Sequence, residues 1–260
     1  MLDLVPLPAF ADNYIWLAAD ADGAAIAVDP GTAQPVREAL ADRGWRLQAI
    51  LLTHHHDDHV GGVPELVAAT GARVHAPHDP RIAQADQRHG DGALIAIDAP
   101  ACRFEVLDVP GHTRSHLAYA GSGLLFCGDT LFGAGCGRLF EGSPGQMLAS
   151  LDRLAALPPT TLICCAHEYT LGNCVFALTI EPHNSDLLAR YAEVQRQRRL
   201  GQPTLPVPLG LERATNPFLR VDAPAVIDWA ARHGIPAADR VARFAALRRA
   251  KDDFRMPPAG

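Results

Sequence analysis

Hydrophobic and polar positions alternate in short blocks over the first 170 residues, a pattern typical of strands separated by helices. Val36, Ala39 and Leu40 recur at helical spacing, whereas Leu47–Leu52 is a mainly apolar segment of strand length in which Gln48 is the one polar residue. The predicted helices of this part are Pro35–Arg43, Val63–Thr70 and Pro144–Leu157. The predicted strands are Leu2–Pro6, Tyr14–Ala19, Ala24–Val28, Leu47–Leu52, Arg73–Ala76, Leu94–Ile97, Phe104–Val109, Leu117–Ala120, Leu124–Cys127 and Thr161–Cys165.

The pattern changes near residue 170, after which helical spacing dominates and little strand signal remains. The predicted helices here are Leu171–Ile180, Ser185–Leu200, Ala223–His233 and Ala237–Arg249. The chain is therefore expected to be an α/β protein. We predict a domain of two sheets with outer helices over residues 1–170 and a helical domain over residues 171–260.

Composition and charge exclude several classes of protein. The chain has 260 residues, of which 48% are hydrophobic and 20% charged, a balance typical of folded globular chains. No apolar run approaches the ~18 residues that a membrane span needs, and the first basic residue is Arg37. The six cysteines form no CxxC pair, so reduced thiols are expected. We expect a cytoplasmic, monomeric protein without a membrane partner.

The net charge of −6 disfavours nucleic acid as a partner, because phosphate binding needs a basic face. The charge is uneven, however. Residues 211–260 carry nine Lys and Arg residues against six Asp and Glu residues, and they include Lys251, the only lysine of the chain. The tail is therefore expected to hold an anionic small molecule.

The strongest chemical signal is the run from Thr53 to His59, which follows the predicted strand Leu47–Leu52. Residues i and i+2 at a strand end point to the same side, so His54 and His56 can share one metal ion. Asp58 and His59 follow on the turn, where they can reach a second ion. The alternative is a polar cluster that caps the next helix, but so many imidazole and carboxylate groups would desolvate or repel one another without a cation.

Three later positions complete the set, each directly after a predicted strand: His112, Asp129 and His167. Seven ligands allow three histidines and Asp129 on one ion, and two histidines and two aspartates on the other. Imidazole and carboxylate ligands without thiolate suit Zn, Mn or Fe, and we expect two Zn²⁺ ions. Two ions ~3.5–4 Å apart lower the pKa of a bridging water toward ~7, which predicts metal-assisted hydrolysis.

These residues resemble the signature of the metallo-β-lactamase superfamily, HxHxDH followed by His, Asp and His. Further segments resemble the glyoxalase II family of hydroxyacylglutathione hydrolases, and together the matches span nearly the whole chain. They are Gly135–Gly142, His167–Thr170, Thr215–Arg220 and Arg248–Phe254. Some family members carry Tyr and Lys where this chain has Phe140 and Arg138.

The resemblance implies an αββα sandwich followed by a helical domain that binds glutathione. It implies one ion on His54, His56 and His112, a second ion on Asp58, His59 and His167, and Asp129 as the bridge. Asp58 and Asp129 are the expected catalytic carboxylates, Asp58 by orienting the nucleophile. The implied substrate contacts are Arg138, Tyr169, Arg248 and Lys251.

Spacing alone leaves the basic tail open to two interpretations. Arg248 and Lys251 are three residues apart near the end of a predicted helix, so they share a face and can offer two cations to one ligand. Basic residues at a helix C-terminus also complement the helix dipole without binding anything.

The expected reaction is hydrolysis of S-(2-hydroxyacyl)glutathione, with S-D-lactoylglutathione giving D-lactate and glutathione in methylglyoxal detoxification. A hydroxide between the two ions is expected to attack the thioester carbonyl. The alternatives are a persulfide dioxygenase of the same fold with one iron, and a metal-binding module without turnover. A missing ligand would indicate the module, but all seven are present.

The remaining histidines are expected to play lesser parts. His55 faces away from the ligands on either side, and His116 is expected in the next strand, with a supporting role left open. Exposed positions are expected for His75, His78, His89, His183 and His233.

Overall fold

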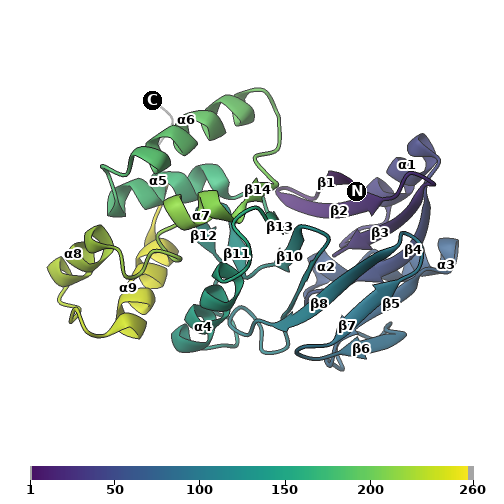
Figure 1. The fold of residues 1–260 in the computed structure, drawn as a ribbon, viewed down its shortest axis with the longest axis horizontal. Coiled ribbons are helices and arrows are strands. Elements are labelled where there is room, and N and C mark those ends of the chain that lie inside the picture. The colour runs from purple at the N-terminus through teal and green to yellow at the C-terminus, as the bar shows by residue number, and fades with distance from the viewer. Residues whose placement is uncertain (1, 257–260) are drawn as a thin grey trace.

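Two six-stranded sheets form the centre of the protein, which a computed structural model describes over residues 2–256 (Figure 1). The first sheet has the order β1-β2-β3-β4-β5-β6, antiparallel from β1 to β3 and parallel from β3 to β6. Its strands are β1 (Asp3–Ala9), β2 (Asn13–Ala19), β3 (Ala24–Val28), β4 (Arg46–Leu51), β5 (Arg73–Pro77) and β6 (Gln87–His89).

The second sheet has the order β14-β13-β10-β9-β8-β7, in which only the β10–β13 pair is parallel. Its strands are β7 (Leu94–Ile97), β8 (Cys102–Asp108), β9 (Leu117–Gly121), β10 (Leu124–Gly128), β13 (Leu162–Cys165) and β14 (Val207–Pro208). A separate small hairpin joins β11 (Leu131–Phe132) to β12 (Gly135–Cys136). The helices are α1 (Gln34–Arg43), α2 (Asp57–Val60), α3 (Val63–Thr70), α4 (Pro144–Ala155), α5 (Thr170–Ile180), α6 (Ser185–Arg199), α7 (Leu209–Thr215), α8 (Pro224–Arg232) and α9 (Arg240–Asp253).

Alternating side chains of β2 enter two different cores, because successive residues of a strand face opposite sides of the sheet. Trp16 and Ala18 belong to the core between the two sheets, which continues to α4, α5, α8 and α9. Ile15 and Leu17 belong to the core beneath α1 and α3. The layers therefore follow the order helix, sheet, sheet, helix, and the predicted αββα sandwich with a helical C-terminal part is confirmed.

The chain after residue 170 is mainly helical, but it also adds a strand to the second sheet. β14 pairs antiparallel with β13, with Leu162 opposite Pro208 and Ile163 opposite Val207. Figure 1 places α8 and α9 at the end of the molecule away from the first sheet, while α5 and α6 lie side by side above the second. No helix within residues 2–256 has the length and apolar character needed to cross a bilayer.

The predicted long elements are all present, and the structure adds only short ones. Val63–Thr70 and Leu94–Ile97 have the predicted bounds, and Gly71 ends α3 with φ +70° while its N–H donates to the Val67 carbonyl. The short elements that the sequence analysis did not predict are α2, α7, β6, β11, β12 and β14.

His75 was predicted to be exposed, and this prediction is wrong. The residue lies on β5, is only 5% exposed, and has its Nδ1 3.0 Å from Nε2 of His89. The unpredicted strand β6 pairs with β5 and brings His89 over it. Burial and the neighbouring His89 lower the pKa of His75 to about 4, so it is neutral at physiological pH.

Candidate metal centre and substrate cavity

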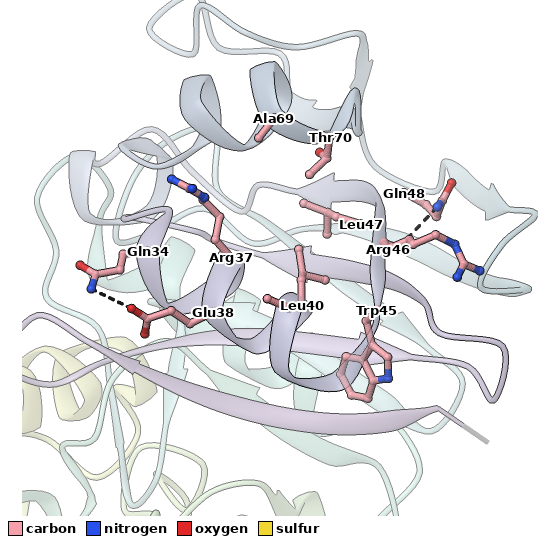
Figure 2. A pocket seen from close by; sticks show the side chains of 11 residues that line it. Gln34, Arg37, Glu38, Leu40, Trp45, Arg46, Leu47, Gln48, Ala69 and Thr70 are labelled. Carbon is pink, nitrogen blue, oxygen red and sulfur yellow. Dashed lines mark hydrogen bonds between the residues drawn. The ribbon is translucent and has the colours of Figure 1, made fainter.

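A hollow of 800 Å³ lies against α1 and α3, and none of the predicted site residues lines it (Figure 2). Arg37, Glu38 and Trp45 contribute to its wall, and Gln34 Nε2 donates to Glu38 Oε1 over 2.8 Å. The described residues that line it include no histidine, cysteine or aspartate. The predicted chemistry therefore belongs elsewhere.

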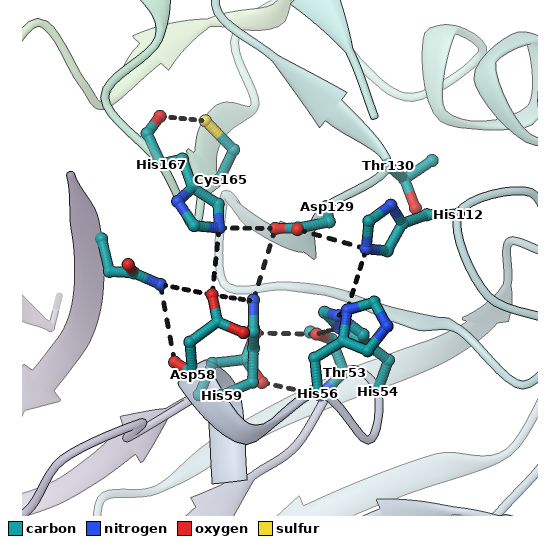
Figure 3. Close-up of polar contacts among 12 residues, drawn as sticks. Thr53, His54, His56, Asp58, His59, His112, Asp129, Thr130, Cys165 and His167 are labelled. Atoms are coloured by element: carbon teal, nitrogen blue, oxygen red, sulfur yellow. Dashed lines mark hydrogen bonds and ion pairs between the residues drawn. The ribbon is translucent and has the colours of Figure 1, made fainter. Parts of the chain in front are cut away.

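The seven predicted ligands meet at one end of the sandwich, where four strands end. Four of them follow β4: His54, His56, Asp58 and His59, the last two within α2. The other three follow β8, β10 and β13: His112, Asp129 and His167. Figure 3 shows the Asp129 carboxylate between the rings of His167 and His112. The fold thus brings together ligands that are up to 113 positions apart in the sequence.

Gly128 lets β10 turn so that Asp129 enters the cluster. Its φ is +46°, and a Cβ atom there would lie 2.4 Å from Thr53 Oγ1, so the turn requires glycine. The Asp129 backbone N–H donates to His116 Nε2 over 3.1 Å. His116 is fully buried and lies just before β9 rather than inside it, and it supports this turn without being one of the ligands.

The first ligand set consists of His54 Nε2, His56 Nδ1 and His112 Nε2. His56 Nδ1 lies 2.9 Å from the His54 nitrogen and 3.1 Å from the His112 nitrogen. Thr53 Oγ1 donates to Asp29, so it accepts from His54 Nδ1 over 3.0 Å. His112 Nδ1 donates to the Arg138 carbonyl over 2.9 Å. Both rings therefore carry their proton on Nδ1 and offer Nε2 to a metal ion.

The second ligand set consists of Asp58 Oδ2, His59 Nε2 and His167 Nε2. The carboxylate oxygen lies 3.6 Å and 3.5 Å from these two nitrogens. Asp129 Oδ1 lies 3.5 Å from His59 Nε2 and 3.4 Å from His167 Nε2, while Asp129 Oδ2 lies 3.3 Å from His112 Nε2. Tetrahedral ligands with bonds of about 2.1 Å lie about 3.4 Å apart, so this spacing fits an ion and places one Asp129 oxygen at each set.

Two buried atoms have no hydrogen-bond partner among the described residues: His59 Nε2 of the second set and the neighbouring Asp129 Oδ1. Although burial opposes it, Asp129 and Asp29 raise the pKa of His59 to about 9. Burial also opposes ionisation of Asp129, but His59 and His167 hold the pKa of that carboxyl well below its usual range. Burial and the surrounding imidazoles lower the pKa of His54. Buried imidazole nitrogens and carboxylate oxygens without hydrogen-bond partners fit divalent cations, which take the place of the protons that these groups would otherwise bind.

The ligands open onto a cavity of 630 Å³ that also collects all four predicted substrate contacts. Arg138 follows β12, Tyr169 is the N-cap of α5, and Arg248 and Lys251 lie on α9. The Tyr169 ring stacks on the His167 ring with their centroids 4.8 Å apart and an interplanar angle of 3°. The four predicted substrate contacts and five of the seven predicted metal ligands thus line one cavity, and the other two ligands, His54 and His59, are buried behind it.

The three cations of the cavity differ in their freedom to bind a ligand. Arg248 is buried and donates to the Cys136 carbonyl over 2.6 Å and to Asp252 over 2.9 Å. Arg138 is largely exposed, with Nε 3.6 Å from Asp252. Lys251 Nζ lies over the rings of Phe176 and Phe254, and burial together with Arg248 and Arg138 lowers the pKa of Lys251.

The sequence analysis missed several residues that contact the ligands. Asp29 follows β3, as the ligands follow their own strands, so its position was a usable signal. Its Oδ2 lies 3.0 Å from His59 Nδ1. Asp12, in the turn between β1 and β2, contacts His167, and Asn13, the first residue of β2, contacts Asp58. No sequence pattern marks either residue. Glu168, next to His167, accepts hydrogen bonds from Tyr14 and Thr204.

Comparison with known proteins gives two family matches that together cover most of the chain. Residues 10–167 match the metallo-beta-lactamase superfamily, and residues 168–254 match the hydroxyacylglutathione hydrolase C-terminus. A curated hydroxyacylglutathione hydrolase from Albidiferax ferrireducens is 52% identical over 97% of this chain and 100% of its own length.

Solved structures agree on the fold. BLEG-1 B3 metallo-beta-lactamase superposes with a TM-score of 0.63 at 23% identity and covers 84% of this chain and 99% of its own. TTHA1623 in a di-iron-bound form superposes with a TM-score of 0.59 at 26% identity and covers 83% of this chain and 100% of its own.

Proposed function

The chain belongs to the hydroxyacylglutathione hydrolases, the glyoxalase II family of the metallo-β-lactamase superfamily, and we propose that it works with two divalent ions on the seven converging side chains. It is a thioester hydrolase that converts hydroxyacylglutathione and water into the hydroxy acid and glutathione. The observation that carries the two-ion proposal is the Asp129 carboxylate, which presents one oxygen to each ligand set. S-D-lactoylglutathione is the proposed main substrate.

The proposed first ion is held by His54, His56 and His112 and the second by Asp58, His59 and His167, with Asp129 between them. Zn²⁺ is the proposed metal, because imidazole and carboxylate donors at this spacing suit it, and Fe or Mn are the alternatives. When bound, two such ions supply a water of lowered pKa and polarise the thioester carbonyl. The di-iron form of TTHA1623 is consistent with two ions in this fold.

Asp58 has a second proposed task, to orient the attacking water. Its side chain is 41% exposed and lines the cavity, whereas His59 beside it is fully buried. Asn13 Nδ2 already donates to Asp58 Oδ2 over 3.0 Å, so the other carboxylate oxygen is the proposed acceptor for the water. A carboxylate in this position can hold a water proton and direct a lone pair at the carbonyl carbon.

The cationic wall opposite the ligands is proposed to hold glutathione. Glutathione carries two carboxylates, and Arg138 and Lys251 offer cations to them from two different elements. Arg248 already bonds Cys136 and Asp252, so its proposed contribution is one further contact from a fixed position. Tyr169 closes the wall next to His167.

Lys251→Ala is expected to raise the KM for S-D-lactoylglutathione about tenfold and to leave kcat nearly unchanged. A charge-assisted hydrogen bond contributes about 1.5–3 kcal/mol, and a contact made equally in ground and transition states affects KM alone. The measurement is the loss of thioester absorbance at varied substrate concentration. Arg249→Ala is the matched control, because it removes the same charge from the neighbouring exposed position of α9 and should change neither constant. Equal KM values for the two variants would remove Lys251 from the glutathione site.

The proposed function is tested by supplying S-D-lactoylglutathione to the metal-loaded protein and following hydrolysis and oxygen consumption in parallel. Hydrolysis without oxygen uptake is expected. Oxygen uptake with glutathione persulfide, together with one iron per chain, would instead indicate the dioxygenase alternative. That alternative is not favoured, since the curated relatives are hydrolases.

We also propose that the protein is a monomer in the cytoplasm. All seven ligands and the four cavity contacts come from one chain, so the site needs no second copy. All six cysteines are buried free thiols, as expected in a reducing compartment. A sedimentation or light-scattering mass near 27.8 kDa is the expected result.

A further inference from the structure

The turn between β1 and β2 reaches from the first sheet to the end of β13 in the second. Tyr14 N–H donates to the Ala166 carbonyl over 2.7 Å, and Glu168 N–H donates to the Asp12 carbonyl over 2.8 Å. Asn13 and His167 form an isolated antiparallel bridge. These backbone contacts fix the turn against the segment that carries His167.

The first side chain of the turn that contacts a ligand is Asp12. Its Oδ1 lies 2.8 Å from His167 Nδ1, in hydrogen-bond geometry. An acceptor at this place keeps the proton on Nδ1, so that Nε2 faces the other ligands, and it also fixes the plane of the ring. The Tyr169 ring also holds the His167 ring, by stacking face to face on it with the two centroids 4.8 Å apart.

The second side chain is that of Asn13, the first residue of β2, which is 8% exposed. Its Nδ2 donates to Asp58 Oδ2 over 3.0 Å and lies 3.5 Å from the Asp58 carbonyl oxygen. Asp58 is the one ligand of the second set whose side chain is substantially exposed, so without a partner it has freedom to rotate into the cavity. The amide of Asn13 thus selects the rotamer that faces His59 and His167.

The first ligand set is supported from elsewhere. His54 bonds Thr53, His112 bonds the Arg138 carbonyl, and His56 packs against Phe140. Among the described residues, no hydrogen bond joins positions 10–13 to these three histidines. Among the described residues, the hydrogen bonds of Asp12 and Asn13 therefore reach only the second set.

We propose that Asp12 and Asn13 are positioning residues that set the retention of the second ion and leave the first ion unaffected. The inference rests on the proposed two-ion function and deepens it by assigning the two halves of the site to different supports. Residues that orient ligands from outside commonly change metal affinity by about 10–100-fold when removed. Loss of either side chain should therefore lower the affinity of one ion by that factor.

The test is titration of the metal-free protein with Zn²⁺ by calorimetry, with elemental analysis of the same samples after dialysis. Wild type should bind two ions. Asp12→Ala and Asn13→Ala should each bind one ion with unchanged affinity and the other about 10–100-fold more weakly. Asp12→Asn keeps an acceptor oxygen for His167 Nδ1, so it should restore much of the lost affinity.

Asp22→Ala is the matched control, because it removes an exposed aspartate from the turn between β2 and β3, at the other end of β2. It should bind both ions as wild type does. Thermal unfolding of the metal-free variants separates a positioning role from misfolding, since the melting temperatures should match that of metal-free wild type.

Unchanged affinities for both ions in the two alanine variants would overturn the inference, and so would an equal weakening of both ions. Wild type that binds one ion at saturating Zn²⁺ would contradict the two-ion function itself and the inference with it. The failure of the two-ion function can be told apart from the failure of the inference, because it is visible in the wild type without any variant.

Discussion

Asp129→Ala should bind neither ion firmly and should lose at least three orders of magnitude in kcat for S-D-lactoylglutathione. The Asp129 carboxylate places Oδ1 near His59 and His167 and Oδ2 near His112, so it reaches both ligand sets. Metal-ion stabilisation contributes several kcal/mol to such a reaction, and each ~1.4 kcal/mol is a factor of ten in rate. The measurements are ions per chain and the rate of thioester loss on the same sample.

Asp108→Ala is the control for that substitution. Asp108 also ends a strand of the second sheet, but it is exposed and does not line the cavity. It should keep two ions and the wild-type rate. If Asp129→Ala also keeps both ions, Asp129 is not a bridge, and the two sets must be held independently.

Gly137→Ala is expected to have the second-largest effect, through the backbone rather than the chemistry. A Cβ atom at position 137 would lie 1.9 Å from the Asp129 carbonyl oxygen and 3.4 Å from His112 Nδ1. Gly137 N–H donates to the Thr130 carbonyl over 3.1 Å, so neither backbone segment has room to retreat without losing that bond. Overpacking of this kind costs about 1–3 kcal/mol or more, and here the displaced atoms belong to the residue that joins both ligand sets.

We expect Gly137→Ala to lower the melting temperature and to reduce hydrolysis by at least tenfold. Gly145→Ala is the matched control, because position 145 lies in α4 and the nearest heavy atom to an added Cβ is Val241 Cγ1 at 3.8 Å. That control should keep full activity and gain slight stability, since alanine is the better helix former. Wild-type activity and melting temperature in Gly137→Ala would show that the close approach of the two backbones is not required.

Long elements of the fold could be predicted from sequence because their periodicity is strong. Val63–Thr70, for example, carries a helical pattern and a glycine stop, and the structure ends the helix at that glycine. The two-residue strand β14 and the single-turn helix α2 are too short to show a period of their own. The burial of His75 was missed for the same reason, because it depends on the three-residue strand β6.

The convergence of the seven candidate ligands could be predicted because each follows a strand, whereas the contacts of Asp12 and Asn13 with two of them could not. Asp12 is 155 positions from His167, and Asn13 is 45 positions from Asp58. Neither pair has a spacing rule, since only the packing of the two sheets brings them together. The tail of α9 shows a second limit, because spacing predicted only that Arg248 and Lys251 share a face. The structure shows that Arg248 is buried and bonded to Cys136 and Asp252, while Lys251 lies over two aromatic rings.

The most direct test of the two-ion thioester hydrolase is the rate of S-D-lactoylglutathione hydrolysis while metal-free protein is titrated with Zn²⁺. The seven converging ligands predict that activity rises until two equivalents are bound and then stays constant. Full activity at one equivalent would contradict the two-ion mechanism. Absence of hydrolysis with two ions bound would contradict the assignment of the substrate.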